Sequence, residues 1–239
     1  MSLPLRRRRR LLVFFGVTAV LIAAGVLLSM LPATREPSPA GRPTASAHAQ
    51  PTGTSAEVDL GGWRWADFHG VRLPYSASDG PHAVVGNRAS GFVQSPAGAL
   101  LAALHLGMRA SPRWGPAVFE PTIAEQFTGS DRPALLRAVH AAYDSLRAAA
   151  GVADGAPLGR AYVVQEAFRW QAYTPDLAIV DVVAAGPGRG GSTVRISTRL
   201  RVVWRDGDWR VVAPPGGDWT QSSAPVTDLT GYTLFPDRG

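Results

Sequence analysis

The chain has 239 residues and no cysteine, which excludes disulfide bonds, thiolate metal sites and cysteine nucleophiles. Its formal net charge is +6, and all 24 basic residues are arginines. Five of these arginines, Arg6 to Arg10, stand together near the start of the chain, so the remainder is close to neutral. The charge therefore does not by itself indicate a nucleic-acid-binding protein.

An uncharged apolar segment, Leu11 to Leu31, follows the arginines directly. A helix of about 20 residues crosses a hydrocarbon core of about 30 Å, whereas a cleaved secretory signal has an apolar stretch of about 7 to 15 residues. The nearest cleavage site is weak because Leu31 stands where a small residue is needed. We therefore favour an uncleaved transmembrane helix over a cleaved signal. The positive-inside rule then places the N-terminus in the cytoplasm and everything after Pro32 outside the cell membrane.

The composition divides the chain into five parts. The segment after the apolar run is rich in Pro, Ser and Thr, has no apolar periodicity and reads as a tether, while the part that follows is long enough for one domain with a core. The predicted parts are a cytoplasmic basic stub (1–10), a transmembrane helix (11–31), a flexible tether (32–57), an exported α+β domain (58–213) and a C-terminal tail anchored by aromatic residues (214–239).

Three helices are predicted in the first half of the exported domain. Ser95 is the expected N-cap of the first, which has proline at its first position and apolar residues at helical spacing after it. A short second helix begins after Trp114 and ends near Gly129. The third and longest helix is expected to be capped by Ser130 and to end at Gly151.

From Gly159 onward the apolar period changes from about 3.6 to 2, which indicates strands. The first strand of this half is expected to place four large side chains on one face: Tyr162, Val164, Phe168 and Trp170. The strand that follows it is apolar on both faces, as in a central strand, except at Asp181.

The turn Asp206-Gly207 is the strongest local signal in the chain, because Asp-Gly between alternating apolar residues predicts a two-residue β-hairpin. In this register Trp204 lies opposite Trp209, and the apolar residues of both strands share one face. The other face would then carry a row of arginines: Arg195, Arg199, Arg201, Arg205 and Arg210.

The order of elements predicts an α+β fold with three helices packed on a curved antiparallel sheet. The stretches ASGFVQSPAGALLAALHLGMR, WGPAVFEPTIAEQFTG and WRDGDWRVVAPPGGDW resemble actinobacterial single-pass membrane proteins of the conjugation and type IV secretion type. The resemblance implies an exported domain with the cone-shaped fold of nuclear transport factor two, also called cystatin-like.

The resemblance further implies a non-enzymatic, membrane-anchored scaffold of a conjugative DNA-transfer or type IV secretion-like channel. The expected partners are other membrane-bound components of that machine, with a homo-oligomer as an open alternative. Direct contact with DNA is not favoured. No catalytic residue, metal site or cofactor is predicted.

The alternative is an exported domain that binds or hydrolyses a small molecule. Its pocket would contain Glu166 and Asp181, because each interrupts an apolar strand and two carboxylates can serve as acid and base. We favour the plainer interpretation, in which both carboxylates pair with arginines of a neighbouring strand, such as Arg195 or Arg199. The arginine row is likewise a candidate surface for an anion or an acidic partner, although a solvated sheet face is the favoured interpretation.

Overall fold

The computed structural model describes residues 56–236. The predicted stub, the transmembrane helix Leu11 to Leu31 and nearly all of the tether lie outside these residues. Within residues 56–236, no helix is long and apolar enough to cross a membrane. On this finding the predicted fold class is corrected, since residues 56–236 contain no transmembrane helix, and the assignment to the cell membrane as a single-pass protein is not supported.

The described part of the chain contains three α-helices, close to where the sequence predicts them. The Ser95 Oγ accepts a hydrogen bond from the Gly98 N–H at 3.0 Å, which confirms the predicted N-cap. The last helix is preceded by Asp131 and not by the predicted cap Ser130, and it ends at Gly151 in a left-handed conformation. The helices are α2 (Pro96–Arg109), α3 (Pro116–Gln126) and α4 (Arg132–Ala150).

Eleven strands and four short 3₁₀ helices complete the described residues. The strands are β1 (Arg64–Phe68), β2 (Val71–Tyr75), β3 (Ala83–Val85), β4 (Arg88–Ser90), β5 (Phe127–Thr128), β6 (Val164–Thr174), β7 (Leu177–Pro187), β8 (Thr193–Arg205), β9 (Asp208–Val212), β10 (Ser223–Pro225) and β11 (Thr233–Leu234). The 3₁₀ helices are η1 (Pro112–Trp114), η2 (Arg189–Gly191), η3 (Pro215–Gly217) and η4 (Trp219–Ser222).

The main sheet has seven strands and is mixed. Its order is β11-β6-β7-β8-β9-β5, and β10 pairs with β8. Strand β5 runs parallel to β9, with Phe127 opposite Val211, so the prediction of a purely antiparallel sheet was wrong. A pair of only two residues is too short to leave a strand pattern in the sequence, which is why the parallel pair was not foreseen.

The hairpin β8–β9 has the predicted register. Trp204 lies opposite Trp209 and Arg205 opposite Asp208. Both turn residues have positive φ, 53° at Asp206 and 76° at Gly207, as a type I′ turn requires.

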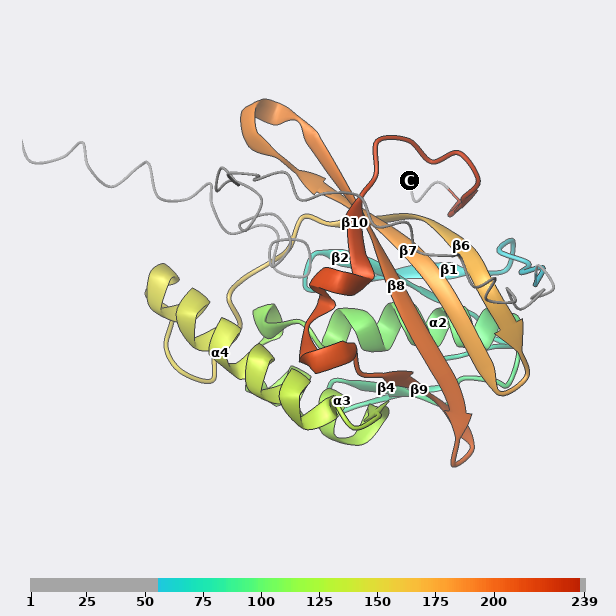
Figure 1. Ribbon diagram of the computed structural model, residues 1–239, viewed down its shortest axis with the longest axis horizontal. Coiled ribbons are helices and arrows are strands. Elements are labelled where there is room, and N and C mark those ends of the chain that lie inside the picture. The colour runs from blue at the N-terminus through green and yellow to red at the C-terminus, as the bar shows by residue number, and fades with distance from the viewer. Residues whose placement is uncertain (1–55, 237–239) are drawn as a thin grey trace, which may run out of the picture.

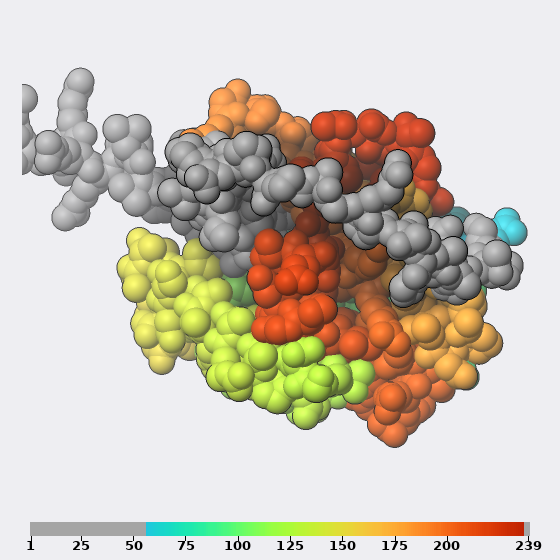
Figure 2. All heavy atoms as spheres, viewed as in Figure 1, coloured from blue at the N-terminus to red at the C-terminus, as the bar shows by residue number. Residues whose placement is uncertain are grey.

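Helix α2 lies across one face of the sheet, which we call the inner face (Figure 1). Helices α3 and α4 lie to one side of the sheet (Figure 1). Every residue of α2 from Gly98 to Arg109 is buried, which fits a helix that is mostly apolar all round. The segment with η3, η4 and β10, drawn in red, lies between α4 and the sheet and closes the middle of this side of the molecule (Figure 2). The sheet and α2 therefore enclose the core.

The C-terminal segment is part of the fold through its aromatic residues. Phe235 is 5 % exposed, and its ring lies 6.3 Å from Trp63, 5.6 Å from Trp65 and 5.3 Å from Phe168, measured between ring centroids. Its N–H donates to the carbonyl of Glu166 at 2.9 Å. The end of the chain thus packs against the start of β6.

Candidate functional site

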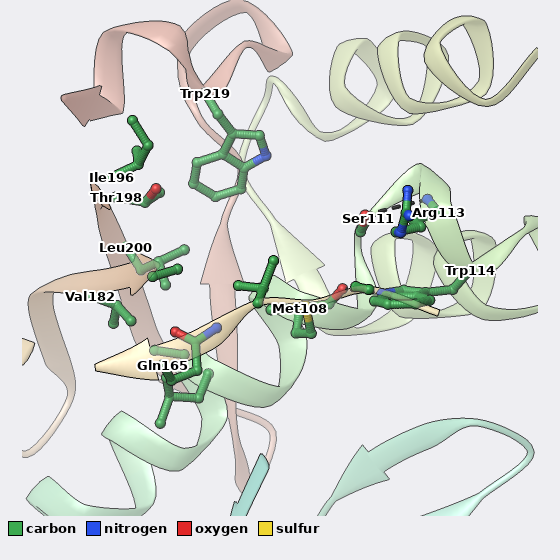
Figure 3. A pocket seen from close by; sticks show the side chains of 16 residues that line it. Met108, Ser111, Arg113, Trp114, Gln165, Val182, Ile196, Thr198, Leu200 and Trp219 are labelled. Atoms are coloured by element: carbon green, nitrogen blue, oxygen red, sulfur yellow. Dashed lines mark hydrogen bonds between the residues drawn. The ribbon is translucent and has the colours of Figure 1, made fainter. Parts of the chain in front are cut away.

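A partly enclosed cavity lies between the second half of α2 and the inner face of β6, β7 and β8 (Figure 3). Its volume is about 80 Å³, counted over the positions open to the centre of a water-sized sphere, and one water needs about 10–15 Å³ on that measure. The wall is formed by Ala103, Leu104, Gly107, Met108, Ser111, Arg113, Trp114, Ala161, Val163, Gln165, Val182, Ala184, Ile196, Thr198, Leu200 and Trp219.

Two of the four α2 residues that line the cavity are small, and the other two are Leu104 and Met108. Ala103 and Gly107 are one helical turn apart, and both line the wall. A Cβ atom added at Gly107 would lie 3.4 and 3.5 Å from the two terminal methyls of Leu200, which is ordinary van der Waals contact. Glycine is therefore not required there by crowding, although it costs about 1 kcal/mol of helix stability relative to alanine.

Two tryptophans stand on different sides of the cavity (Figure 3). Trp114 is 2 % exposed, and its indole N–H donates to the Met108 carbonyl at 2.7 Å, which fixes the ring. Trp219 is half-buried and is the first residue of η4, whose N-cap Asp218 accepts a hydrogen bond from the Thr220 N–H. The cavity thus has one rigid aromatic wall and one carried by a short surface helix.

Gln165 is the polar side chain that the sequence pattern did not place at this site. The pairing of β6 with β7 shifts between Gln165 and Ala167, so that Glu166 is an extra residue in a β-bulge. As a result Gln165 lies on the inner face together with Phe168, opposite Ala184 and Val182. A strand without a bulge would put residues 165 and 168 on different faces.

The bulge also overturns the predicted face of this strand. Tyr162 and Val164 are 70 % and 49 % exposed, whereas the neighbouring Val163 and Gln165 line the cavity. The prediction that Tyr162 and Val164 share one face with Phe168 was therefore wrong. The interruption of the apolar alternation by two adjacent polar residues, Gln165 and Glu166, was the available signal.

The polar atoms of the wall differ in whether they are already bonded. The Ser111 Oγ accepts from the Arg113 N–H at 3.3 Å, and the Thr198 hydroxyl lies 3.1 Å from that of Ser223. An Arg113 Nη2–H donates to the Arg160 carbonyl at 3.1 Å, and burial lowers the pKa of this guanidinium. In contrast, the Oε1 of Gln165 is buried and has no hydrogen-bond partner. The residue as a whole is only 3 % exposed.

The carboxylates expected at a pocket, Glu166 and Asp181, do not line the cavity. Glu166 binds Arg195 through two hydrogen bonds of 2.6 and 3.3 Å. Asp181 lies opposite Arg199 and accepts from it at 2.7 and 3.1 Å. The two carboxylates are thus members of cross-strand ion pairs, which is the plainer of the two interpretations.

Asp181 is the more deeply buried of the two, with its side chain 5 % exposed. It also accepts from Arg169 at 3.1 Å and from the Gln171 amide at 2.7 Å. Burial alone would raise the pKa of Asp181, but the hydrogen bonds from Arg199 and Arg169 outweigh it and hold the pKa below its usual value. Asp181 therefore stays ionised and cannot act as a general acid near neutral pH.

The five arginines of the predicted basic row do not form one free surface. Arg195 and Arg199 are neutralised by their carboxylate partners, and Arg210 donates to the Glu125 carbonyl. Arg201 and Arg205 are exposed, at the end of β8. Two exposed arginines on one strand are typical of a solvated sheet face.

His105 is the most strongly perturbed titratable group among residues 56–236. Its Nε2–H donates to the Pro74 carbonyl at 2.7 Å, so its Nδ1 must accept from Arg109, whose Nη1 lies 2.8 Å away. Burial and the Arg109 charge lower the pKa of His105 to about 3. Neither residue lines the cavity, and both serve the packing of α2.

In residues 56–236, no three His, Asp or Glu side chains are grouped so as to hold a metal ion. The chain belongs to a family described as a domain of unknown function, DUF8175, whose model matches residues 28–234. No curated protein and no solved structure matches the chain. The comparisons therefore do not support the resemblance to conjugation and type IV secretion proteins or to the nuclear transport factor two-like cone. The family assignment that replaces this resemblance is the domain of unknown function. The scaffold role and its partners stay untested.

Proposed function

We propose that this member of a family of unknown function is a binding domain that holds a small, mainly apolar molecule between α2 and the sheet. The observation that carries the proposal is the apolar cavity beside Ala103 and Gly107. Protein cores are packed to nearly crystalline density, so neighbouring side chains would fill the space beside Ala103 and Gly107 in an ordinary core. Ligand pockets, in contrast, are mostly apolar hollows with few polar groups.

The wall supports binding and offers little for catalysis. Among the described residues that line the cavity, Arg113 is the one with a titratable side chain. Acid–base and nucleophilic catalysis both depend on a positioned group that gains or loses a proton or is activated by such a group. The chemistry of these side chains therefore favours reversible binding of a molecule that leaves unchanged.

The size of the cavity limits the ligand to about one ring or a short aliphatic chain. Removing about 200 Å² of apolar surface from water contributes about 5 kcal/mol. For a single-ring probe this corresponds to a Kd on the order of 0.1 to 1 mM. The natural ligand can bind more tightly if it also uses the polar atoms of the wall.

The test is a ¹⁹F NMR titration of the full chain with fluorobenzene. We expect saturable binding that is lost in Ala103→Leu, because the larger side chain occupies the cavity. Ala141→Leu is the matched control, since Ala141 is exposed on α4 and the change is the same. Circular dichroism verifies that both variants fold. Absence of saturable binding, or unchanged binding in a folded Ala103→Leu protein, would contradict the proposed function.

A further inference from the structure

We infer that the molecule bound in this cavity carries a hydroxyl group and that the Gln165 amide is the residue that selects it. The inference rests on the proposed function and adds the chemical class of the ligand: an uncharged phenol or alcohol with an apolar body. It follows from a neutral polar group of the described wall, the Gln165 amide, whose oxygen is buried and has no hydrogen-bond partner.

The position of Gln165 makes it a contact for a ligand. Its side chain points into the cavity among Met108, Val182 and Leu200 (Figure 3). A buried amide oxygen without a partner is rare in folded proteins, because it has lost its hydrogen bonds to water and gained none. A donor on the ligand would restore that bond, and a molecule without one would leave the oxygen unsatisfied.

The backbone fixes Gln165 in this position without help from the ligand. The bulge residue Glu166 is held from the other face by its two hydrogen bonds to Arg195. Its carbonyl also accepts from the Phe235 N–H of the C-terminal segment. Because the bulge is held by contacts away from the cavity, the amide is in place before binding, and little conformational entropy is lost when a ligand enters.

The surroundings of Gln165 favour an uncharged partner. Apolar side chains surround its amide, and Arg113, the cation of the described wall, lies at the other side of the cavity in Figure 3. A carboxylate placed at Gln165 would be removed from water with no cation beside it, which is far less favourable than burying a neutral group. A hydroxyl both donates and accepts, so it can pair with either atom of the amide.

The two hydroxyls of the wall differ from the Gln165 oxygen. Those of Ser111 and Thr198 each already have one hydrogen-bond partner in the protein. The rest of the ligand would lie against Leu104, Ile196 and Leu200, which offer only apolar contacts. The wall thus selects one hydroxyl at the Gln165 end and an apolar body elsewhere.

The experiment compares three probes of similar size by ¹⁹F NMR titration of the full chain: fluorobenzene, 4-fluorophenol and 4-fluorobenzoate. We expect 4-fluorophenol to bind about 5- to 10-fold more tightly than fluorobenzene, the gain of one hydrogen bond. We expect 4-fluorobenzoate to bind more weakly than both. In Gln165→Leu the advantage of the phenol should vanish while fluorobenzene still binds.

The control variant is Gln171→Leu, which makes the same change on the same strand but outside the cavity. It should keep the preference for the phenol. Equal affinities of phenol and benzene in the unmodified chain, or a preference that survives Gln165→Leu, would overturn the inference and leave the proposed function standing. Tightest binding of the benzoate would overturn the uncharged class. Failure of all three probes to bind would remove the proposed function and the inference together.

Discussion

Replacing Gly107 by alanine should stabilise the protein and narrow the cavity at the same time. The added methyl would lie in ordinary contact with Leu200, 3.4 and 3.5 Å from its terminal carbons. Alanine in place of glycine inside a helix contributes about 1 kcal/mol, and burying one methyl contributes up to about 0.8 kcal/mol. The free energy of unfolding should therefore rise by about 1 to 2 kcal/mol.

Differential scanning calorimetry measures this change as a rise in Tm of roughly 2 to 8 °C for a domain of this size. The matched control is Gly98→Ala in the first turn of the same helix. A Cβ there would lie 2.0 Å from the Val93 carbonyl oxygen, so the backbone would have to move and the Tm should fall. A Tm that falls in Gly107→Ala would refute the reasoning, because it would mean that no open space lies between α2 and Leu200.

Three further predictions concern residues away from the cavity. Because the folded pKa of His105 is about 3 against an ordinary value of 6.5, the unfolded chain takes up a proton in this window that the folded chain does not. The free energy of unfolding should therefore fall by about 1 kcal/mol between pH 6.5 and 5.5, and urea titrations at these two pH values should show a smaller difference in His105→Gln. Trp209→Ala should cost about 3 to 5 kcal/mol because Trp209 is 1 % exposed, whereas exposed Arg205→Ala should cost under about 1 kcal/mol; the reverse ranking in urea unfolding would mean that the hairpin faces are inverted. Asp181→Asn should lower stability by about 1 to 3 kcal/mol, since it weakens charge-assisted hydrogen bonds to arginines, and should leave fluorobenzene binding unchanged; altered binding would place Asp181 at the site after all.

The sequence predicts those parts of the fold that depend on neighbouring residues. The cap Ser95 and the turn Asp206-Gly207 are local features, and both are found as predicted. The ion pair of Asp181 with Arg199 follows from charge complementarity on adjacent strands, whereas Glu166 on β6 reaches Arg195 on β8 across the intervening β7. The two-residue strand β5 and its parallel pairing have no local pattern and could only be seen in the structure.

The candidate site was missed for a similar reason. A β-bulge adds one residue to the count, so every face assigned by alternation on the far side of Glu166 is reversed. Gln165 was therefore not expected among the inner side chains. The cavity also depends on residues far apart in the chain, from Ala103 to Trp219, and no spacing rule relates them. Six of the fourteen residues of α2 are alanine or glycine, so the small residues Ala103 and Gly107 gave no distinct local signal.

Met108 provides the most direct measurement of the central claim that the cavity binds a hydroxylated apolar molecule. The chain has three methionines, Met1, Met30 and Met108, and Met108 lines the cavity. With ¹³C-methyl methionine in the full chain, we predict that 4-fluorophenol shifts the Met108 methyl resonance saturably and gives intermolecular nuclear Overhauser effects between that methyl and the phenol ring. Met108→Leu assigns the signal. A Met108 methyl that stays unmoved and shows no such effect at saturating phenol would contradict the account.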